Sequence, residues 1–219
     1  MKILVACEES QTITKELRAL GHIAFSCDLQ ECSGGHPEWH FQRDVFDIIE
    51  LGWDMMIAHP PCTYLSVSGL HWNKKDPVRA QKTEDGLSFV QKLMNVDIPK
   101  IAIENPVSCI SSRIRKPEQI VNPYQFGDDA SKKTCLWLKG LTRLEVTEYI
   151  EPRIVDGKKR WGNQTDDGQN FMLDERGKVM GWNTDAIKKA RSKTFPGLAK
   201  AIAEQWTKEP VEEIFELEP

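Results

Sequence analysis

Residues 54–69 read D-M-M-I-A-H-P-P-C-T-Y-L-S-V-S-G, and the interpretation of the whole chain starts from this stretch. The apolar residues 55–58 predict a short buried strand, and the His-Pro-Pro of residues 59–61 ends it. Cys62 therefore follows the carboxyl end of a strand, with prolines fixing the backbone before it. A thiol presented in this way suits a nucleophile, although burial as an inert side chain is the commoner state of cysteine.

Upstream of this stretch, the pattern alternates between strand and helix. Residues 2–6 predict a strand, residues 11–20 an amphipathic helix that ends at Gly21, and residues 22–27 a second strand that ends at Asp28. This order predicts a doubly wound α/β sheet, in which ligands bind at the carboxyl ends of the strands. Asp28 is placed to bind two ribose hydroxyls, and an aspartate that holds a turn is the alternative.

Downstream, four further elements are predicted. Residues 85–95 have the pattern of a helix, and residues 100–103 that of a buried strand ending at Glu104-Asn105. Residues 144–161 alternate around Asp156-Gly157, which indicates a β-hairpin. Residues 195–203 have apolar spacing typical of an amphipathic closing helix with proline near its start.

Composition is that of an ordinary globular protein, with 219 residues, 40% hydrophobic and 28% charged. No apolar run approaches the ~20 residues that cross a bilayer, and acidic residues follow the first apolar run too closely for a signal peptide. We therefore expect a cytoplasmic protein without membrane association. Its six cysteines form no C-x-x-C pair, which favours free thiols over a disulfide framework.

The net charge of -4 hides an uneven distribution. Residues 111–200 carry a net charge of +6, whereas the segments before and after each carry -5. A basic central segment of this kind can contact phosphates. An ordinary solvated surface is the alternative.

Several residues of the opening stretch match a known motif in register: Asp54, Pro60, Pro61, Cys62, Ser66 and Gly69. The stretch resembles the Pro-Pro-Cys motif of the cytosine carbon-5 DNA methyltransferases, with His59 in place of a glycine and Thr63 in place of a glutamine. In that family the cysteine thiolate adds to carbon 6 of cytosine, and carbon 5 then takes a methyl group from S-adenosylmethionine. The resemblance implies this nucleophilic role for Cys62.

The strand end at Glu104-Asn105 resembles the Glu-Asn-Val motif of the same family, with Pro106 in place of valine. The family's glutamate bonds the ring nitrogen and the exocyclic amine of cytosine, so the resemblance implies Cys62, Glu104 and Asn105 as the catalytic residues. Burial at a strand end is expected to raise the pKa of Glu104, which allows it to hold a proton.

The cofactor turn departs from the family. The methyltransferases have Phe-x-Gly-x-Gly-Gly after the first strand, whereas residues 5–10 read V-A-C-E-E-S and contain no glycine. A turn of another shape must then approach the cofactor. The resemblance implies S-adenosylmethionine as cofactor, with Asp28 on the ribose and Asp44 on the adenine amine. The full set of expected cofactor-binding residues is Cys7, Glu8, Asp28, Asp44, Pro60 and Phe195.

Aromatic and basic residues are interleaved in residues 68–79, which is typical of segments that bind nucleic acid by stacking and phosphate contacts. Trp72 as an ordinary core residue is the alternative. Lys132 stands where the family has an arginine, and it keeps the charge without the planar fork. The expected substrate-binding residues are Ser66, His71, Trp72, Lys132 and Lys133.

Together these features predict a Rossmann-like α/β fold of the S-adenosylmethionine-dependent methyltransferase kind, with a small β-rich insertion. The catalytic domain is expected over residues 1–139 and 186–208, a reduced recognition insertion over residues 140–185, and an acidic tail over residues 209–219. The expected partner is nucleic acid, with DNA favoured, and no metal is expected.

Other interpretations remain open at this stage. The spacing of Cys27, Cys32, His36 and His40 is one that a zinc site can use. The cytosine could belong to RNA or to a free nucleotide, and an altered cofactor could supply another group. The chain could also be a catalytically silent binding module, although such a module needs neither Cys62 nor Glu104.

Overall fold

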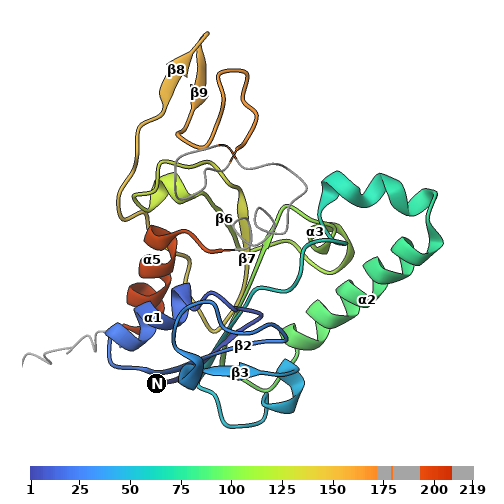
Figure 1. Ribbon diagram of the computed structural model, residues 1–219, viewed down its shortest axis with the longest axis vertical. Coiled ribbons are helices and arrows are strands. Elements are labelled where there is room, and N and C mark those ends of the chain that lie inside the picture. Colours follow the sequence, from blue (N-terminus) through green and yellow to red (C-terminus); the bar gives the residue numbers. More distant parts are fainter. Residues whose placement is uncertain (172–178, 180–192, 209–219) are drawn as a thin grey trace, which may run out of the picture.

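The computed structural model describes residues 1–171, residue 179 and residues 193–208 (Figure 1). Its centre is a seven-stranded sheet in the order β3-β2-β1-β4-β5-β7-β6. The strands are β1 (Lys2–Ala6), β2 (Ile23–Asp28), β3 (His40–Gln42), β4 (Met55–Ala58), β5 (Lys100–Pro106), β6 (Gln119–Val121) and β7 (Thr134–Lys139). Of these, β7 runs antiparallel to both of its neighbours, and the other pairs are parallel. The predicted Rossmann-like α/β class is therefore confirmed.

The strand order reverses between β1 and β4. From β1 the chain builds outward through β2 to β3, and it then returns to place β4 and β5 on the other side of β1. In open α/β sheets the ligand crevice lies outside the carboxyl ends of the strands at such a switch point. This position is occupied here by the residues that follow β1 and β4.

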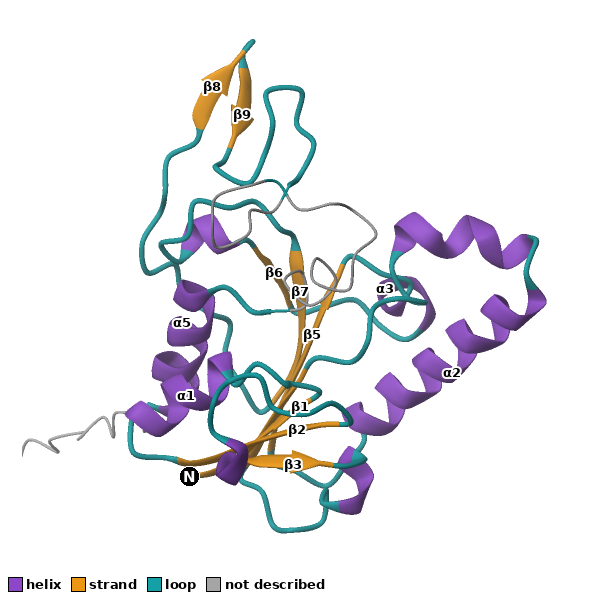
Figure 2. Ribbon diagram, viewed as in Figure 1, coloured by secondary structure: helices purple, strands orange, loops and turns teal. Residues whose placement is uncertain are grey.

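Helices cover both faces of the sheet (Figure 2). On one face, α1 (Thr12–Ala19) and α5 (Pro196–Thr207) pack against each other and against Ile3, Val5, Met55 and Ile57. On the other face, α2 (Pro77–Met94) covers Leu4, Ala6, Met56 and Ala58. Successive residues of a strand point to opposite faces, so a strand buried on both faces must be apolar throughout. This requirement explains the unbroken apolar runs of β1 and β4.

Helix α2 begins earlier in the chain than predicted. The helix predicted over residues 85–95 ends as expected, but α2 begins at Pro77, eight residues earlier. The side chain of Asp76 accepts a hydrogen bond from the main-chain N–H of Arg79 at 3.0 Å, and Pro77 occupies the first helical position. This cap and the proline start the helix. The stretch is polar, so no apolar periodicity marks the beginning of α2 in the sequence.

The predicted hairpin at Asp156-Gly157 is confirmed. Its strands are β8 (Arg153–Val155) and β9 (Lys158–Arg160), and both turn residues have positive φ angles, 50° and 72°. Paired positive φ angles match the right-handed twist of the strands on either side. The remainder of the expected insertion lies partly outside the described residues, and the expected acidic tail lies entirely outside them.

Short helical turns join the larger elements. They are η1 (Pro37–Trp39), η2 (Val45–Asp47), η3 (Val67–Lys74), α3 (Ile110–Arg113) and η4 (Pro123–Gln125). Among the helices of the described residues, none is both long and apolar enough to span a membrane.

Gly197, in the first turn of α5, gives a test of this packing. A methyl group added there would overlap the carbonyl oxygen of Phe126. Overpacking against a fixed backbone atom costs about 1 to 3 kcal/mol or more, so Gly197→Ala is expected to lower the free energy of unfolding by at least that much. Urea denaturation measures the change.

Lys200→Ala is the matched control, because Lys200 lies exposed on the same helix. It should change the free energy of unfolding by less than about 0.5 kcal/mol. A Gly197→Ala variant as stable as the control would contradict the close approach of α5 to Phe126.

Candidate active site

The candidate site lies at the carboxyl ends of β4 and β5, which are neighbouring parallel strands. Ala58 pairs with Ile103, so His59 and Glu104 follow at the same level of the sheet. The main-chain N–H of His59 also donates to the carbonyl of Ala6 at 2.9 Å, which fixes the chain to the end of β1. Residues far apart in the sequence thus meet at the switch point of the sheet.

Cys62 lies in the loop after β4, and its side chain is exposed. The carbonyl of Cys62 accepts hydrogen bonds from the main-chain N–H groups of Leu65 and Ser66, at 3.0 and 2.9 Å. Asn105 of β5 donates from Nδ2 to the carbonyl of Pro60 at 2.8 Å, and this hydrogen bond is buried. The loop around the thiol is therefore held by main-chain turns and by a side chain from the neighbouring strand. Presentation of Cys62 to solvent agrees with the expectation from the sequence.

Glu104 is buried, and its Oε2 lies 2.7 Å from Nδ1 of His59. Burial raises the pKa of Glu104, but the hydrogen bond and charge of His59, together with the charge of Lys132, outweigh it and hold the pKa below its usual range. The expectation of a raised pKa for Glu104 is therefore wrong: burial acts in the expected direction, but the net pKa is lowered. The sequence could not reveal the compensating imidazole, because the pairing depends on the register of two strands.

Two other predicted residues lie close to this carboxylate. Nζ of Lys132 is 6.0 Å from the centre of the Phe195 ring, and its charge acts on both Glu104 and His59. Phe195 itself caps the start of α5 and packs against the core face that α1 covers. The structure thus brings Lys132 and its neighbour Phe195 to the side of the sheet on which Glu104 lies, whereas Lys133 is exposed.

Three residues of the predicted cofactor site lie together at the ends of β1, β2 and β3. Cys7 has a left-handed backbone with φ of 59°, a conformation that glycine usually adopts. Burial raises the pKa of the Cys7 thiol, and the negative charges of Asp28 and Asp44 raise it further, so the thiol stays protonated at neutral pH. The electrostatic coupling indicates that both carboxylates lie near this thiol.

Asp28 and Asp44 also hold the local turns. Oδ1 of Asp28 accepts from the N–H of Gln30 at 2.9 Å, and Oδ1 of Asp44 accepts from the N–H of Phe46 at 3.0 Å. Asp28 is half-buried and Asp44 is exposed. The turn role that the sequence left open for Asp28 is therefore present, and it leaves the second carboxylate oxygen available for a further contact.

Glu8 is buried and takes the place of a missing helix cap. Its carboxylate accepts from the N–H of Ile13 at 2.7 Å, from the N–H of Thr14 at 3.4 Å and from Oγ1 of Thr14 at 2.7 Å. A carboxylate at this end of α1 satisfies N–H groups that have no partner within the helix and matches the positive end of the helix dipole. Burial raises the pKa of Glu8, and the charge of His59 opposes that rise.

The segment predicted to bind substrate forms η3 and projects from the sheet beside α2 (Figure 1). Trp72 is 53% exposed, so the alternative that it is a core residue is wrong. The rings of His71 and Trp72 lie 4.7 Å apart, and Nζ of Lys75 is 5.9 Å from the Trp72 ring. Ser66, at the start of this segment, is half-buried.

The residues of the zinc alternative do not form a ligand set. Within the part of the chain that the structure describes, no group of three His, Cys, Asp or Glu residues can hold a metal ion. Cys27 donates to the carbonyl of Arg43, and Cys32 to Oε1 of Gln11. His40 bonds the side chain of Ser26, and His36 stacks on Trp39 with ring centres 3.7 Å apart. These residues therefore hold the loop between β2 and β3 together.

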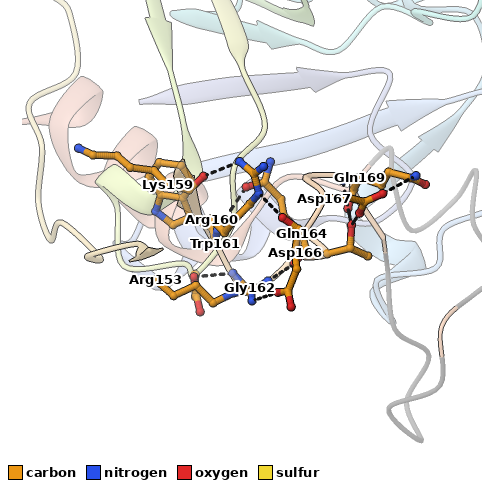
Figure 3. A network of polar contacts seen from close by, with 11 residues as sticks. Arg153, Lys159, Arg160, Trp161, Gly162, Gln164, Asp166, Asp167 and Gln169 are labelled. Atoms are coloured by element: carbon orange, nitrogen blue, oxygen red, sulfur yellow. Dashed lines mark hydrogen bonds and ion pairs between the residues drawn. The ribbon is translucent and has the colours of Figure 1, made fainter. Parts of the chain in front are cut away.

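Around the hairpin, the arginines are used within the protein (Figure 3). Arg153 forms an ion pair with Asp166 and also bonds the carbonyl of Gln164. Arg160 donates from Nε to the carbonyl of Asp166 at 3.0 Å. These contacts fasten residues 162–170 to the hairpin, so neither arginine is a simple surface cation.

Trp161, next to the hairpin, is also structural. Its ring stacks on Tyr124 at 4.2 Å, and the side chain is buried. Lys158 and Lys159 are exposed at the end of the hairpin. The basic character of the hairpin therefore rests on these two lysines.

Comparisons with known proteins find similarity among solved structures. No protein-family model matches the sequence, and no curated protein matches it. Among solved structures, the chain is similar to the crystal structure of the Dnmt2 methyltransferase of S. pombe, with a TM-score of 0.44 and 16% sequence identity. The similarity covers 64% of this chain and 50% of the Dnmt2 chain, so this chain spans half the length of that protein.

No role was predicted from the sequence for His59, which the structure places in contact with Glu104. Glu8 was predicted to bind the cofactor, whereas its carboxylate bonds the start of α1. The available signal for His59 was its position, since it is an ionisable residue directly after a buried strand of an α/β sheet.

Asn105→Ala tests how the Cys62 loop is held. The substitution leaves the carbonyl of Pro60 without its donor, and a buried group left without its hydrogen bond costs about 1 to 3 kcal/mol. Urea denaturation should show a loss of that size. Asn95→Ala, at the exposed end of α2, is the control and should cost less. Equal effects of the two substitutions would contradict a positioning role for Asn105.

Proposed function

We propose that the protein transfers a methyl group from S-adenosylmethionine to carbon 5 of cytosine in a polynucleotide, most readily DNA. One observation carries the proposal: an exposed cysteine follows β4, while a buried carboxylate, Glu104, lies on the adjacent strand β5 directly beyond its pairing with β4. Addition of a thiolate to a cytosine ring needs these two groups side by side, one to attack and one to hold the pyrimidine edge. The motif resemblance supports the same roles for Cys62 and Glu104.

The reaction begins when the target cytosine leaves its stack, at an unstacking cost of about a few kcal/mol. Sγ of Cys62 adds to carbon 6, and the electron pair of the 5,6 double bond becomes available at carbon 5. Glu104 bonds the ring nitrogen and the exocyclic amine, which favours this addition. After carbon 5 has received the methyl group, a base removes its proton and the bond from Sγ to carbon 6 breaks. The product leaves and the thiolate is restored.

The residues at the ends of β1, β2 and β3 fit the nucleoside part of S-adenosylmethionine. Asp28 and Asp44 offer carboxylate oxygens suited to a ribose diol and an adenine amine, and their charge favours a sulfonium cation. The amino-terminal end of α1 is already occupied by the carboxylate of Glu8, so the carboxylate of the ligand must bind elsewhere. When bound, the cofactor supplies an electrophilic methyl group.

A polynucleotide substrate is supported by the surface beside Cys62. His71 and Trp72 offer exposed rings for stacking, and Lys74 and Lys75 add charge next to them. Stacking of a base on an aromatic side chain contributes about 1 to 3 kcal/mol without regard to base identity. The hairpin adds two exposed lysines and few side chains for reading base edges. We infer relaxed sequence preference.

Covalent trapping tests the cysteine role. An oligonucleotide that contains 5-fluorocytosine cannot lose fluorine as a proton is lost, so a methylated adduct should persist. Intact-protein mass spectrometry with S-adenosylmethionine is expected to detect this adduct on the wild type and not on Cys62→Ala. Cys32→Ala is the matched control, because Cys32 lies half-buried in another loop, and it should trap like the wild type. An adduct on any other cysteine would overturn the assignment.

Asp28→Ala tests the cofactor assignment. Loss of a hydrogen bond to a charged group costs about 1.5 to 3 kcal/mol, which weakens binding of S-adenosylmethionine by roughly 10- to 100-fold. Isothermal titration calorimetry measures the change. Asp54→Ala is the control, because Asp54 precedes β4 at its amino end, away from the carboxyl ends of the strands. Wild-type protein that binds no cofactor at millimolar concentration would favour the silent binding module.

Salt dependence tests the substrate class. Each phosphate contact steepens the dependence of binding on salt by about 0.7 to 0.9 in log-log slope. We expect a slope that reports several phosphates, and a smaller slope for Lys74→Ala/Lys75→Ala. Modification of a random-sequence DNA library at several salt concentrations provides the measurement. Efficient methylation of dCMP or CMP with DNA unmodified would exclude a polynucleotide substrate.

A further inference from the structure

His59 stands where the resembled Pro-Pro-Cys motif has a glycine, and its contacts indicate more than a packing role. Its main chain is tied to β1 through the carbonyl of Ala6, and its ring reaches across to β5, where Nδ1 lies 2.7 Å from Oε2 of Glu104. Both side chains are about nine-tenths buried, with exposures of 9% and 10%. The contact is a short, buried pairing of an imidazole with the carboxylate that faces the pyrimidine.

The charged groups around His59 come from three elements. Glu104 lies on β5, Glu8 follows β1, and Lys132 precedes β7. Burial lowers the pKa of His59, but the bond and charge of Glu104 and the charge of Glu8 outweigh it, with Lys132 opposing them, and the pKa lies above its usual value. The imidazole is therefore charged while Glu104 is ionised. As a carboxylate, Glu104 itself carries no proton that it could donate to the cytosine ring.

The second ring nitrogen of His59 is a separate observation. Nε2 is buried and has no hydrogen-bond partner among the described residues. A buried polar group without a partner requires an explanation, and a role in proton transfer or ligand contact is one of the usual ones. If the pair of His59 and Glu104 served only to join β4 and β5, both ring nitrogens of His59 would be expected to have hydrogen-bond partners.

We propose that His59 holds the proton that the pyrimidine needs, and that Glu104 passes it on. As Sγ of Cys62 bonds to carbon 6, the proton on Nδ1 moves to Oε2 of Glu104. Rotation of the carboxyl group then turns Oε2 toward the pyrimidine, and Oε2 gives the same proton to ring nitrogen 3. The thiolate charge and the proton cancel in the adduct, while His59 becomes neutral and Glu104 remains ionised. When the sulfur leaves, the proton returns by the same path. His59 is thus a positioning residue that acts through Glu104, and this role rests on the proposed function.

The first arm of the test does not depend on activity. NMR titration of ¹⁵N-histidine-labelled protein reports the protonation of His59, with the signal assigned from His59→Asn. The His59 imidazole should titrate above the ordinary value of about 6.5. Glu104→Gln should lower that value, because the paired carboxylate is removed. An imidazole that is neutral throughout neutral pH would overturn the proposal.

The second arm separates a proton role from a structural one. In His59→Asn the amide nitrogen can still donate to Glu104 but cannot exchange a proton in this pH range. Since a positioned general acid contributes about 10²- to 10⁴-fold, single-turnover methyl transfer at neutral pH should fall by about that factor. The wild-type rate should decline as pH rises through the raised pKa of His59. In the variant the decline should occur at lower pH. Without the imidazole, the proton must be held by Glu104 itself, and a carboxyl group becomes protonated only at lower pH.

The outcomes distinguish this role from the proposed function. An active wild type with an equally active His59→Asn, or with an unchanged pH profile in the variant, would overturn the proton role and leave the cytosine chemistry standing. A wild type that transfers no methyl group to cytosine at any pH, even with His59 charged, would overturn both.

Discussion

The parallel pairing of β4 with β1 and β5 is the constraint on which the site depends. Because all three strands are buried on both faces, their apolar runs fix the register, and a slip by one residue would bury the wrong side chains. That register brings His59 opposite the end of β1 and level with Glu104. The cysteine loop begins directly beyond it. The packing of the sheet therefore determines which ionisable groups meet at its edge.

The turns after β1 and β4 are shaped by Cys7, Glu8 and His59 and contain no glycine. Glu8 satisfies the start of α1 with its own carboxylate, and Cys7 adopts the left-handed conformation without being glycine. The charge of Glu8 then supports an imidazolium at His59, which in turn keeps Glu104 ionised. The turn that was expected to serve a cofactor thus also sets the charge of the group that faces the pyrimidine.

The sequence predicted the parts of the fold that periodicity controls. β1 and β4 have the predicted bounds, because unbroken apolar runs between turn residues mark fully buried strands. The start of α2 was missed because a cap and a proline, rather than an apolar stripe, begin it. The exposure of Cys62 could be predicted from the prolines before it. The bond between His59 and Glu104 could not, since it joins residues 45 positions apart through strand register.

The most direct measurement of the central claim is tritium release from DNA that carries tritium at carbon 5 of cytosine. Transfer of a methyl group to carbon 5 must displace that hydrogen, whereas transfer to a nitrogen leaves it in place. The account predicts release of tritium in equal amount to the methyl groups incorporated, dependent on S-adenosylmethionine and lost in Cys62→Ala. Methyl incorporation with tritium retained on the base would contradict it.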